Sequence, residues 1–422
     1  MPPAQHDRNV YALLGSLLCS STAMVMQATV LGKHVFDITG REIDLGLLGL
    51  AEFAPAAVLV LVTGSVADRH DRRKVAAAGL LGEAVATAGI LAYVATDPSA
   101  VGPIFGLVLL FGIARAFAAP AARALPADIV EPDRVPWVVA RYSATWQIAA
   151  IVGPVAGGIL YAVDTRLPYV TVMAIAAVGA VLILQVDRQH GRAQRPAAPV
   201  EAPAPLPDAA NAVVPKARFG EAVEGLRFIR TQPILLGAIS LDLFAVLFGG
   251  AIALLPAIAD ERLGVGAVGF GWLRAAVGIG AAAVTLRLAV KPLERRVGPT
   301  LLLAVAGFGA ATIVLGLTTN YVVAFVALLV ASGADSVSVF VRASLVPLVT
   351  PEHKRGRVLA VENVFIGASN ELGAFESGVV GQLLGPAGAI VLGGVGTLAV
   401  AGGWWFLFPD LRDVDEFPDS TD

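Results

Sequence analysis

The sequence predicts an all-α membrane protein with twelve transmembrane helices in two six-helix bundles. Hydrophobic residues make up 56% of its 422 residues and charged residues only 15%, against roughly 25% charged in an ordinary soluble domain. Long apolar runs also follow one another along the whole chain. A bilayer core about 30 Å thick needs roughly 20 apolar residues per helix, and these runs reach that length. The excess apolar surface must therefore face lipid.

Apolar runs separated by polar turns define the expected helices in order. The first six are expected at 10–36, 45–67, 75–95, 101–122, 135–162 and 167–187. The first run is longer than the apolar core of a signal peptide and is expected to remain as a helix. The second six are expected at 233–259, 265–289, 299–318, 321–347, 358–384 and 387–408. A soluble helical protein would need polar faces that most of these runs lack.

Basic residues are distributed unevenly between the two sets of turns. Nineteen lysines and arginines lie on the side of residues 68–74, including the middle segment 188–230, and four lie in the opposite turns: Lys33, Arg41, Arg166 and Arg262. Cytoplasmic loops carry the excess of Lys and Arg. Both termini and the middle segment are therefore predicted to be cytoplasmic.

The middle segment divides the chain into three expected parts: a bundle over 1–187, a linker over 188–232, and a bundle with a short tail over 233–422. Residues 193–215 are rich in Ala and Pro, which is typical of disorder. Residues 219–230 place Phe219, Val223, Leu226 and Ile229 on one helical face. This spacing predicts a short helix on the membrane surface; the alternative is a loop with chance periodicity.

A faint internal repeat supports two duplicated halves. Arg123 precedes Pro132 by nine residues, and Arg342 precedes Pro351 by nine. The run GPVAGG at 153–158 recurs as GAFESG at 373–378, at almost the same offset. Duplicated six-helix halves with a substrate site between them are typical of secondary transporters.

The charged run GSVADRHDRRK at 64–74 lies between the second and third expected helices. Asp68 ends a helix, where the helix dipole disfavours an anion, so it needs a cation or another helix N-terminus. On charge alone the run is a solvated basic turn. Its order, however, resembles the signature loop of the major facilitator superfamily, with Asp71 where that family commonly has Gly. The matching residues, which the resemblance implies form a cytoplasmic gate, are Gly64, Asp68, Arg69, Arg72, Arg73 and Lys74.

The corresponding turn in the second half, RLAVKPLERRV at 287–297, keeps its basic end but lacks the Gly and the Asp. If the turns form a latch, that latch is expected to be one-sided. The resemblance to the superfamily covers essentially the whole chain, because twelve spans and a central cytoplasmic loop match its fold.

Two further elements resemble the same family. Arg115, in the fourth expected helix, resembles its membrane-embedded arginine, implied there to assist proton coupling; the alternative is a structural ion pair. The run 153–158 resembles the antiporter motif of the fifth helix, although Ala149 stands where an upstream Gly is usual. Close packing or bending between the bundles is expected at Gly153, Pro154, Gly157 and Gly158, and likewise at Gly373 and Gly378.

The run GRVLAVENVFIGASNELGAFESG at 356–378 resembles a bacterial subgroup that contains the enterobactin exporter and related drug-efflux proteins. Helical geometry puts Glu362, Ser369 and Glu376 on one face, with Glu371 nearly opposite. Carboxylates inside a bilayer are proton-relay candidates by default. Glu371 and Glu376 are the deeper pair, whereas Glu362 lies about one turn from the cytoplasmic end and is expected to be structural.

Other polar residues within the spans complete the candidate site. Glu52 and Asp335 are further proton-coupling candidates. Cavity-lining candidates are Gln27, Arg141, Gln147, Asp242, Arg274 and Asn370, with Arg274 a possible partner for Asp242 or Asp335.

These features predict a transporter rather than an enzyme. We expect proton-coupled export of a small organic molecule, a siderophore or drug-like compound, from the bacterial inner membrane by a monomer. The alternatives are an importer or uniporter and a non-transporting sensor of the same fold. An ATP-driven pump needs a G-x-x-x-x-G-K-[ST] loop, and none of the five lysines lies in one.

No cofactor, metal or nucleic acid is expected. The net charge is −3, which does not favour nucleic acid. The five histidines have no metal-type spacing, and the only cysteine, Cys19, excludes an intrachain disulfide. The expected partners are protons, the small-molecule substrate and the lipid bilayer.

Overall fold

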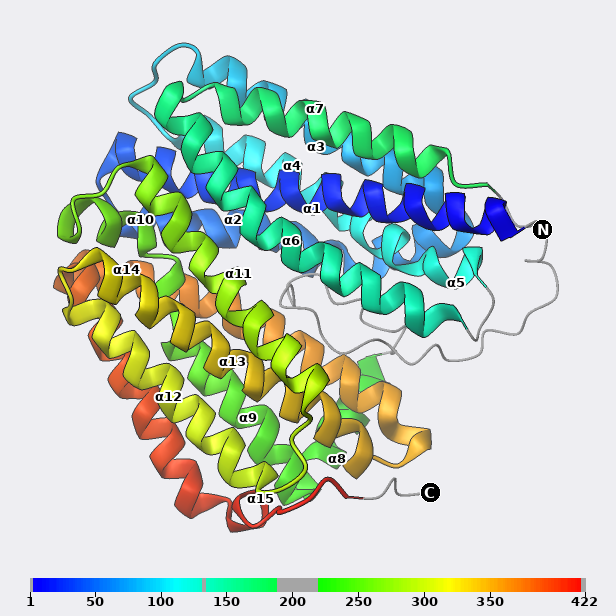
Figure 1. The fold of residues 1–422 in the computed structure, drawn as a ribbon, viewed down its shortest axis with the longest axis vertical. Helices are drawn as coiled ribbons and strands as arrows, with labels where there is room; N and C mark the ends of the chain where they lie inside the picture. Colours follow the sequence, from blue (N-terminus) through cyan, green and yellow to red (C-terminus); the bar gives the residue numbers. More distant parts are fainter. Residues whose placement is uncertain (1–2, 131–133, 188–218, 419–422) are drawn as a thin grey trace. The chain divides into compact units, whose positions relative to one another are not determined.

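The computed structural model describes residues 3–130, 134–187 and 219–418, which form helices and turns without a strand (Figure 1). The chain divides into two compact units. The first unit contains residues 1–39 and 51–206, and the second contains residues 40–50 and 207–422. The predicted Pro/Ala-rich stretch, 193–215, lies outside the described residues.

Seven helices run from the N-terminus to residue 184. They are α1 (Pro3–Thr39), α2 (Glu42–Arg69), α3 (Arg72–Val94), α4 (Gly102–Ala124), α5 (Pro126–Ile129), α6 (Val135–Val163) and α7 (Leu167–Leu184). In the first unit, α1 packs against α6 and α7, and α3 packs against α4 and α7. Pro at the first or second position begins α4, α5, α6 and α7, where its missing N–H costs nothing.

The remaining elements belong to the second unit. They are α8 (Phe219–Thr231), α9 (Pro233–Phe248), η3 (Gly250–Ile252), α10 (Leu255–Ala257), η4 (Ile258–Arg262), α11 (Ala267–Val290), α12 (Val297–Leu317), α13 (Tyr321–Val349), α14 (Glu352–Leu407) and α15 (Pro409–Arg412). Here α12 packs against α13 and α14, α11 packs against α13, and α9 packs against α14.

The long helix α14 consists of two helices. Gly385 has φ 75° and ψ 160°, which interrupts the helical backbone immediately before Pro386. Only glycine adopts this conformation readily. The break lies where the apolar pattern predicts the turn between the eleventh and twelfth spans.

The predicted all-helical membrane fold is confirmed. Among the described residues, ten helical segments are long and apolar enough to cross a membrane, with Pro233–Arg262 counted as one and all of α14 as another. The break at Gly385 divides α14 into two spans, and the 28-residue α2 adds one more. The chain is therefore a multi-pass membrane protein with twelve spans.

The units do not divide at the predicted boundaries, because Gly40–Leu50 groups with the second unit. A Cβ added at Gly46 would lie 2.9 Å from Phe375 Cα, and one added at Gly378 would lie 2.9 Å from the Glu42 carbonyl oxygen. Two glycines thus let the first turns of α2 contact the backbone of α14 directly, in the manner of small-residue contacts between membrane helices. The predicted linker helix, α8, also groups with the second unit.

Candidate functional site

A polar cluster in the first unit forms where α2, α3 and α4 approach closely. A Cβ added at Gly82 would lie 2.9 Å from Ala114 Cβ, so α3 and α4 nearly touch there. A Cβ at Gly112 would lie 2.6 Å from the carbonyl oxygen of Glu52 on α2. These contacts place Glu52, Glu83 and Arg115 at a similar height along the three helices. We call these three residues, with Gln27 and Thr87, the first-unit polar cluster.

Glu83 is the buried member of this cluster, with 4% of its surface exposed. Arg115 and Glu52 are half-buried, and both their charges act on Glu83. One arginine thus stands among two carboxylates inside a membrane span, where unpaired charges are costly. A group of this composition is chemically able to bind and release a proton.

A buried amide of α1 contacts α3 one helical turn beyond Glu83. Thr87, one turn beyond Glu83 on α3, donates to Gln27 Oε1 of α1 at 2.5 Å. Gln27 is 1% exposed, and its Nε2 has no hydrogen-bond partner among the described residues. A buried donor without an acceptor is able to bind a polar ligand or an ordered water.

The sequence placed Gln27, Glu52 and Arg115 among the candidates but left out Glu83. The signal was available, because Glu83 is an acidic residue inside an apolar run and such residues are functional candidates by default. What a single sequence lacks is the approach of α3 to α4 that puts Glu83 near Arg115.

A second group of charges lies within the second unit. Arg342 Nη2 of α13 is 2.6 Å from Asp242 Oδ1 of α9, and Arg342 Nη1 is 3.8 Å from Glu362 Oε1 of α14. The exposed fractions of Arg342, Asp242 and Glu362 are 3%, 4% and 3%. We call these three residues the second-unit ion cluster. Asp335, half-buried on α13, is close enough for its charge to interact with those of Asp242 and Arg342.

The other predicted polar site residues of α14 are less buried than the second-unit ion cluster. Glu371, Glu376 and Asn370 are half-buried. A Cβ added at Gly49 of α2 would lie 3.1 Å from Glu371 Oε2. Glu362, expected to be structural, is thus the most deeply buried acid of α14, and its partner Arg342 was absent from the predicted site.

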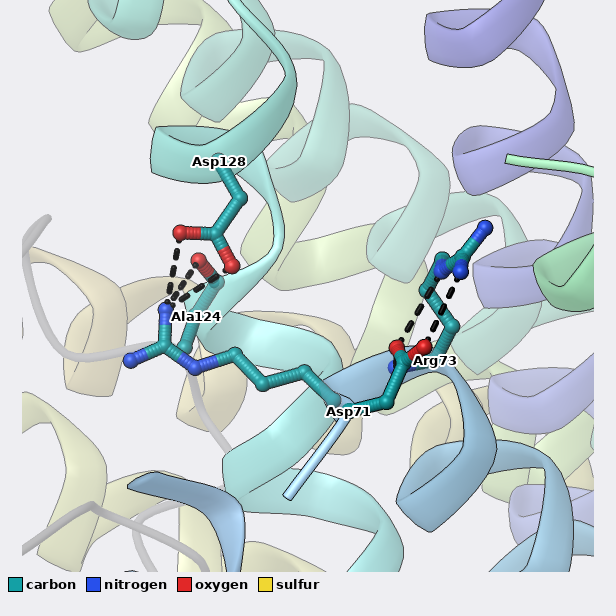
Figure 2. Close-up of polar contacts among 5 residues, drawn as sticks. Asp71, Arg73, Ala124 and Asp128 are labelled. Atoms are coloured by element: carbon teal, nitrogen blue, oxygen red, sulfur yellow. Dashed lines mark hydrogen bonds and ion pairs between the residues drawn. The ribbon is translucent and has the colours of Figure 1, made fainter. Parts of the chain in front are cut away.

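The signature turn between α2 and α3 is fixed by two arginines (Figure 2). Arg72 Nη1 donates to both carboxylate oxygens of Asp128 on α5, at 3.1 and 3.0 Å, and to the Ala124 carbonyl oxygen at 3.3 Å. The Asp71 side chain caps α3 by accepting from the Arg73 backbone N–H at 3.1 Å, and it also pairs with the Arg73 guanidinium at 2.9 Å.

Not every residue of the signature takes part in these contacts. Arg69 and Lys74 are exposed, and the Asp68 side chain lies outside the described residues. A Cβ added at Gly64 would have no described atom within 4 Å, so this glycine is not at a close helix contact. Asp128 was missed because it lies 56 residues after Arg72 and only the folded chain brings them together.

The glycine motifs pack helices within each unit. A Cβ at Gly153 would lie 3.2 Å from Met26 N, and one at Gly157 would lie 3.1 Å from Met26 Cγ, so α6 packs on α1 there. Pro154 and Gly158 are buried in the same helix. A Cβ at Gly373 would lie 2.7 Å from the Val246 carbonyl oxygen of α9.

Three predicted cavity residues differ in exposure and in their partners. Arg141 is exposed, with its Cζ 3.5 Å from the centroid of the Trp137 ring, a cation–π contact. Gln147 is half-buried. Arg274 Nη1 donates to the Ile252 carbonyl oxygen at 3.4 Å, while Asp242 pairs with Arg342.

The fold and the buried charges define a polytopic membrane protein of the transporter type. A model of the Major Facilitator Superfamily matches residues 13–374, most of the chain. The chain therefore belongs to this superfamily, whose members are transporters of small molecules. No curated protein sequence matches the chain.

Solved structures share the fold. A bacterial homolog to the human lysosomal transporter Spinster, inward-facing and unoccupied, matches with a TM-score of 0.69 and 16% identity over 98% of this chain and 97% of that chain. A POT family transporter in complex with a thioalcohol-conjugated peptide matches at 0.71 and 11%, over 96% of each chain. A D-xylose-proton symporter matches at 0.67 and 15%, over 96% and 98%.

Proposed function

We propose that this protein is a proton-coupled secondary transporter that exports a small organic molecule from the bacterial cytoplasm. It acts as a monomer in the inner membrane, with both termini in the cytoplasm. The observation that carries the proposal is the first-unit polar cluster, in which the charges of Arg115 and half-buried Glu52 both act on buried Glu83. A carboxylate pair around one arginine inside a membrane is suited to bind and release a proton.

The cluster couples a proton to the substrate through charge balance. When Glu83 carries a proton, Arg115 and Glu52 balance each other and the cluster is neutral. When Glu83 loses the proton, the cluster carries excess negative charge, which a cationic or donor-rich substrate relieves. Proton and substrate then occupy the site alternately, as export driven by proton entry requires.

The direction and the substrate class rest on sequence features. The resemblance of 356–378 to the enterobactin-exporter subgroup and of GPVAGG at 153–158 to the antiporter motif both favour export. The candidate substrates are catecholate siderophores and cationic drug-like compounds. Glu371 and Glu376 of α14 stay proton-relay candidates, because both are half-buried acids within a span.

Transport into liposomes tests the proposal. Purified protein is reconstituted with an acidic lumen, and uptake of ethidium and of iron-free enterobactin is measured with and without a protonophore. We expect at least one probe to accumulate in the acidic lumen and to leave when the protonophore is added. If neither probe, nor any of a wider panel of cationic dyes and catecholates, accumulates with the gradient, proton-coupled export is wrong.

A conservative variant tests the cluster itself. Glu83→Gln removes the titratable group while keeping its shape, so gradient-driven accumulation should fall at least tenfold while probe exchange without a gradient continues. Glu224→Gln, at an exposed acid of α8, is the matched control and should behave as the wild type. Equal accumulation by Glu83→Gln and wild type would place the coupling group elsewhere.

A further inference from the structure

The second-unit ion cluster holds more buried acid than base. Asp242 and Glu362 are both almost fully buried, and Arg342 is the cation that both approach. Asp242 is directly paired, because its Oδ1 lies 2.6 Å from Arg342 Nη2. Arg342 carries the single positive charge of the cluster, and this contact pairs it with Asp242. An ionised Glu362 would leave a buried negative charge without a counter-charge, which the interior disfavours strongly.

The hydrogen bonding of Glu362 gives an independent indication. Its Oε1 is 3.8 Å from Arg342 Nη1, beyond hydrogen-bond distance, and this oxygen has no hydrogen-bond partner among the described residues. An ionised carboxylate would attract the guanidinium and accept its protons. Arg342 Nε is also buried without a partner among the described residues. Its N–H could donate to an ionised Glu362 but does not do so in this structure.

We propose that Glu362 is a proton-binding site of this transporter, occupied in this structure and controlled by the arginine it shares with Asp242. With the proton on Glu362, Arg342 is bound to Asp242 alone. When the proton leaves, Glu362 becomes an anion, and the free Nε–H and the nearby Nη1 of Arg342 bind it. Release of one proton thus draws α14 toward α13, so the occupancy of the site is linked to a helix movement.

Asp335 is a further acid of α13 whose charge interacts with this cluster. It lies seven residues before Arg342, and so two turns along the same face of α13, about 10 Å away at 1.5 Å per residue. Asp335 is half-buried where Arg342 is not, and its charge interacts with those of Asp242 and Arg342.

The charges that act on Glu362 are those of Arg342 and Asp242. The helix α12 has no charged residue over Val297–Leu317. In the elements around α14, Glu224 of α8 pairs with Arg357, and Glu42 of α2 lies beside Gly378 and Gly381.

Infrared spectroscopy tests the proton directly and needs no substrate. The wild-type protein in lipid nanodiscs at neutral pH should show the C=O stretch of a protonated carboxyl group that resists exchange with deuterated water. Glu362→Gln should remove one component of this band, seen in the difference spectrum against the wild type, because Glu83 can contribute to the rest. Glu352→Gln, at an exposed acid of the same helix, should leave the band unchanged. A difference spectrum of Glu362→Gln that lacks this component overturns the proposal.

A second variant covers the case in which Glu362→Gln does not fold. Asp242→Asn removes the present partner of Arg342, so Glu362 should ionise to replace it, and the component that Glu362→Gln removes should be missing at neutral pH. An unchanged band in Asp242→Asn contradicts the sharing of Arg342. The inference rests on the proposed function only for the use of the proton, because the infrared result can hold or fail whatever the liposome assay shows.

Discussion

The basic turn between α2 and α3 and the basic turn between α11 and α12 occupy corresponding places in the two halves of the sequence. They differ in which part of the chain supplies their hydrogen-bond partners. In the turn between α2 and α3, the contacts come from nearby in the same half. Asp71 caps α3 through the Arg73 backbone N–H. Arg72 binds Asp128 on α5 and the end of α4.

The turn between α11 and α12 contains one acid, Glu294, but no side chain caps the start of α12. Arg296 there adopts φ 54°, and no side chain of the turn caps α12. The C-terminal tail supplies the acceptors instead. The carbonyl oxygens of Asp415 and Val414 accept from the backbone N–H groups of Val297 and Gly298 at 3.1 and 2.9 Å, and Asp415 Oδ1 accepts from the Arg296 N–H at 3.1 Å.

This difference shows what a helix start without a capping side chain requires. The first N–H groups of a helix need acceptors whatever the sequence before them. In the first half one aspartate within the turn provides the cap. In the second half a segment more than a hundred residues later provides it, so the tail is a structural part of the second unit.

Among the changes that test this comparison, deletion of residues 414–422 should lower the free energy of unfolding most. It removes three hydrogen bonds to the start of α12, each contributing about 1 kcal/mol, and the edge-to-face contact of Phe417 with Phe340, which contributes about 1 kcal/mol. The free energy of unfolding should fall by about 3–4 kcal/mol in an SDS titration followed by tryptophan fluorescence. Deleting 419–422 alone keeps these contacts and is the control; equal losses from both deletions would refute the capping role.

Breaking the Arg72–Asp128 contact should come next. Arg72→Ala leaves the half-buried Asp128 without its paired donors, so the free energy of unfolding should fall by about 2 kcal/mol. Asp128→Ala should cost a similar amount, and the double variant less than the sum, with a coupling of about 1–2 kcal/mol. Arg69→Ala, at an exposed arginine of the same turn, should have little effect. Additive losses would mean that the contact contributes nothing.

The contrast between the turns also shows how far sequence reasoning reaches. The spans follow from the apolar runs, because each must match the thickness of the membrane, and Gly385 with Pro386 marks the break in α14. The basic character of both turns is equally visible. The partners of these basic residues are not, because Asp128 and Asp415 come close to them only after the helices pack.

Prediction from sequence meets the same limit at the candidate site. Arg115 and Glu52 stand out as charges within apolar runs, and the structure puts both near Glu83. Glu362 was expected to be structural because its depth was judged along its own helix. Its chemistry depends on Arg342 of another helix, and no periodicity within one helix reveals which neighbour it faces.

Replacing the cap of the first turn should have a smaller effect. Asp71→Ala removes the acceptor for the Arg73 N–H at the start of α3 and should lower the free energy of unfolding by about 1 kcal/mol. Asp71→Asn keeps a capping oxygen and loses the ion pair with the Arg73 guanidinium, so it should retain most of the stability. The same SDS titration distinguishes the two, and an Asn variant as unstable as the Ala variant would assign the stability to the ion pair.

The smallest effect is expected at the exposed pair of the second turn. Arg295 and Glu416 are 3.3 Å apart, but their side chains are 77% and 63% exposed, so solvent and salt screen the attraction. Glu416→Ala should change the free energy of unfolding by about 0–0.5 kcal/mol. Its neighbour Asp415→Ala should cost about 1 kcal/mol, because it removes a cap rather than a surface charge. When both variants are measured at low and high salt, only the effect of Glu416→Ala should vanish at high salt. A salt-sensitive loss in Asp415→Ala would show that the tail acts by charge and not by capping α12.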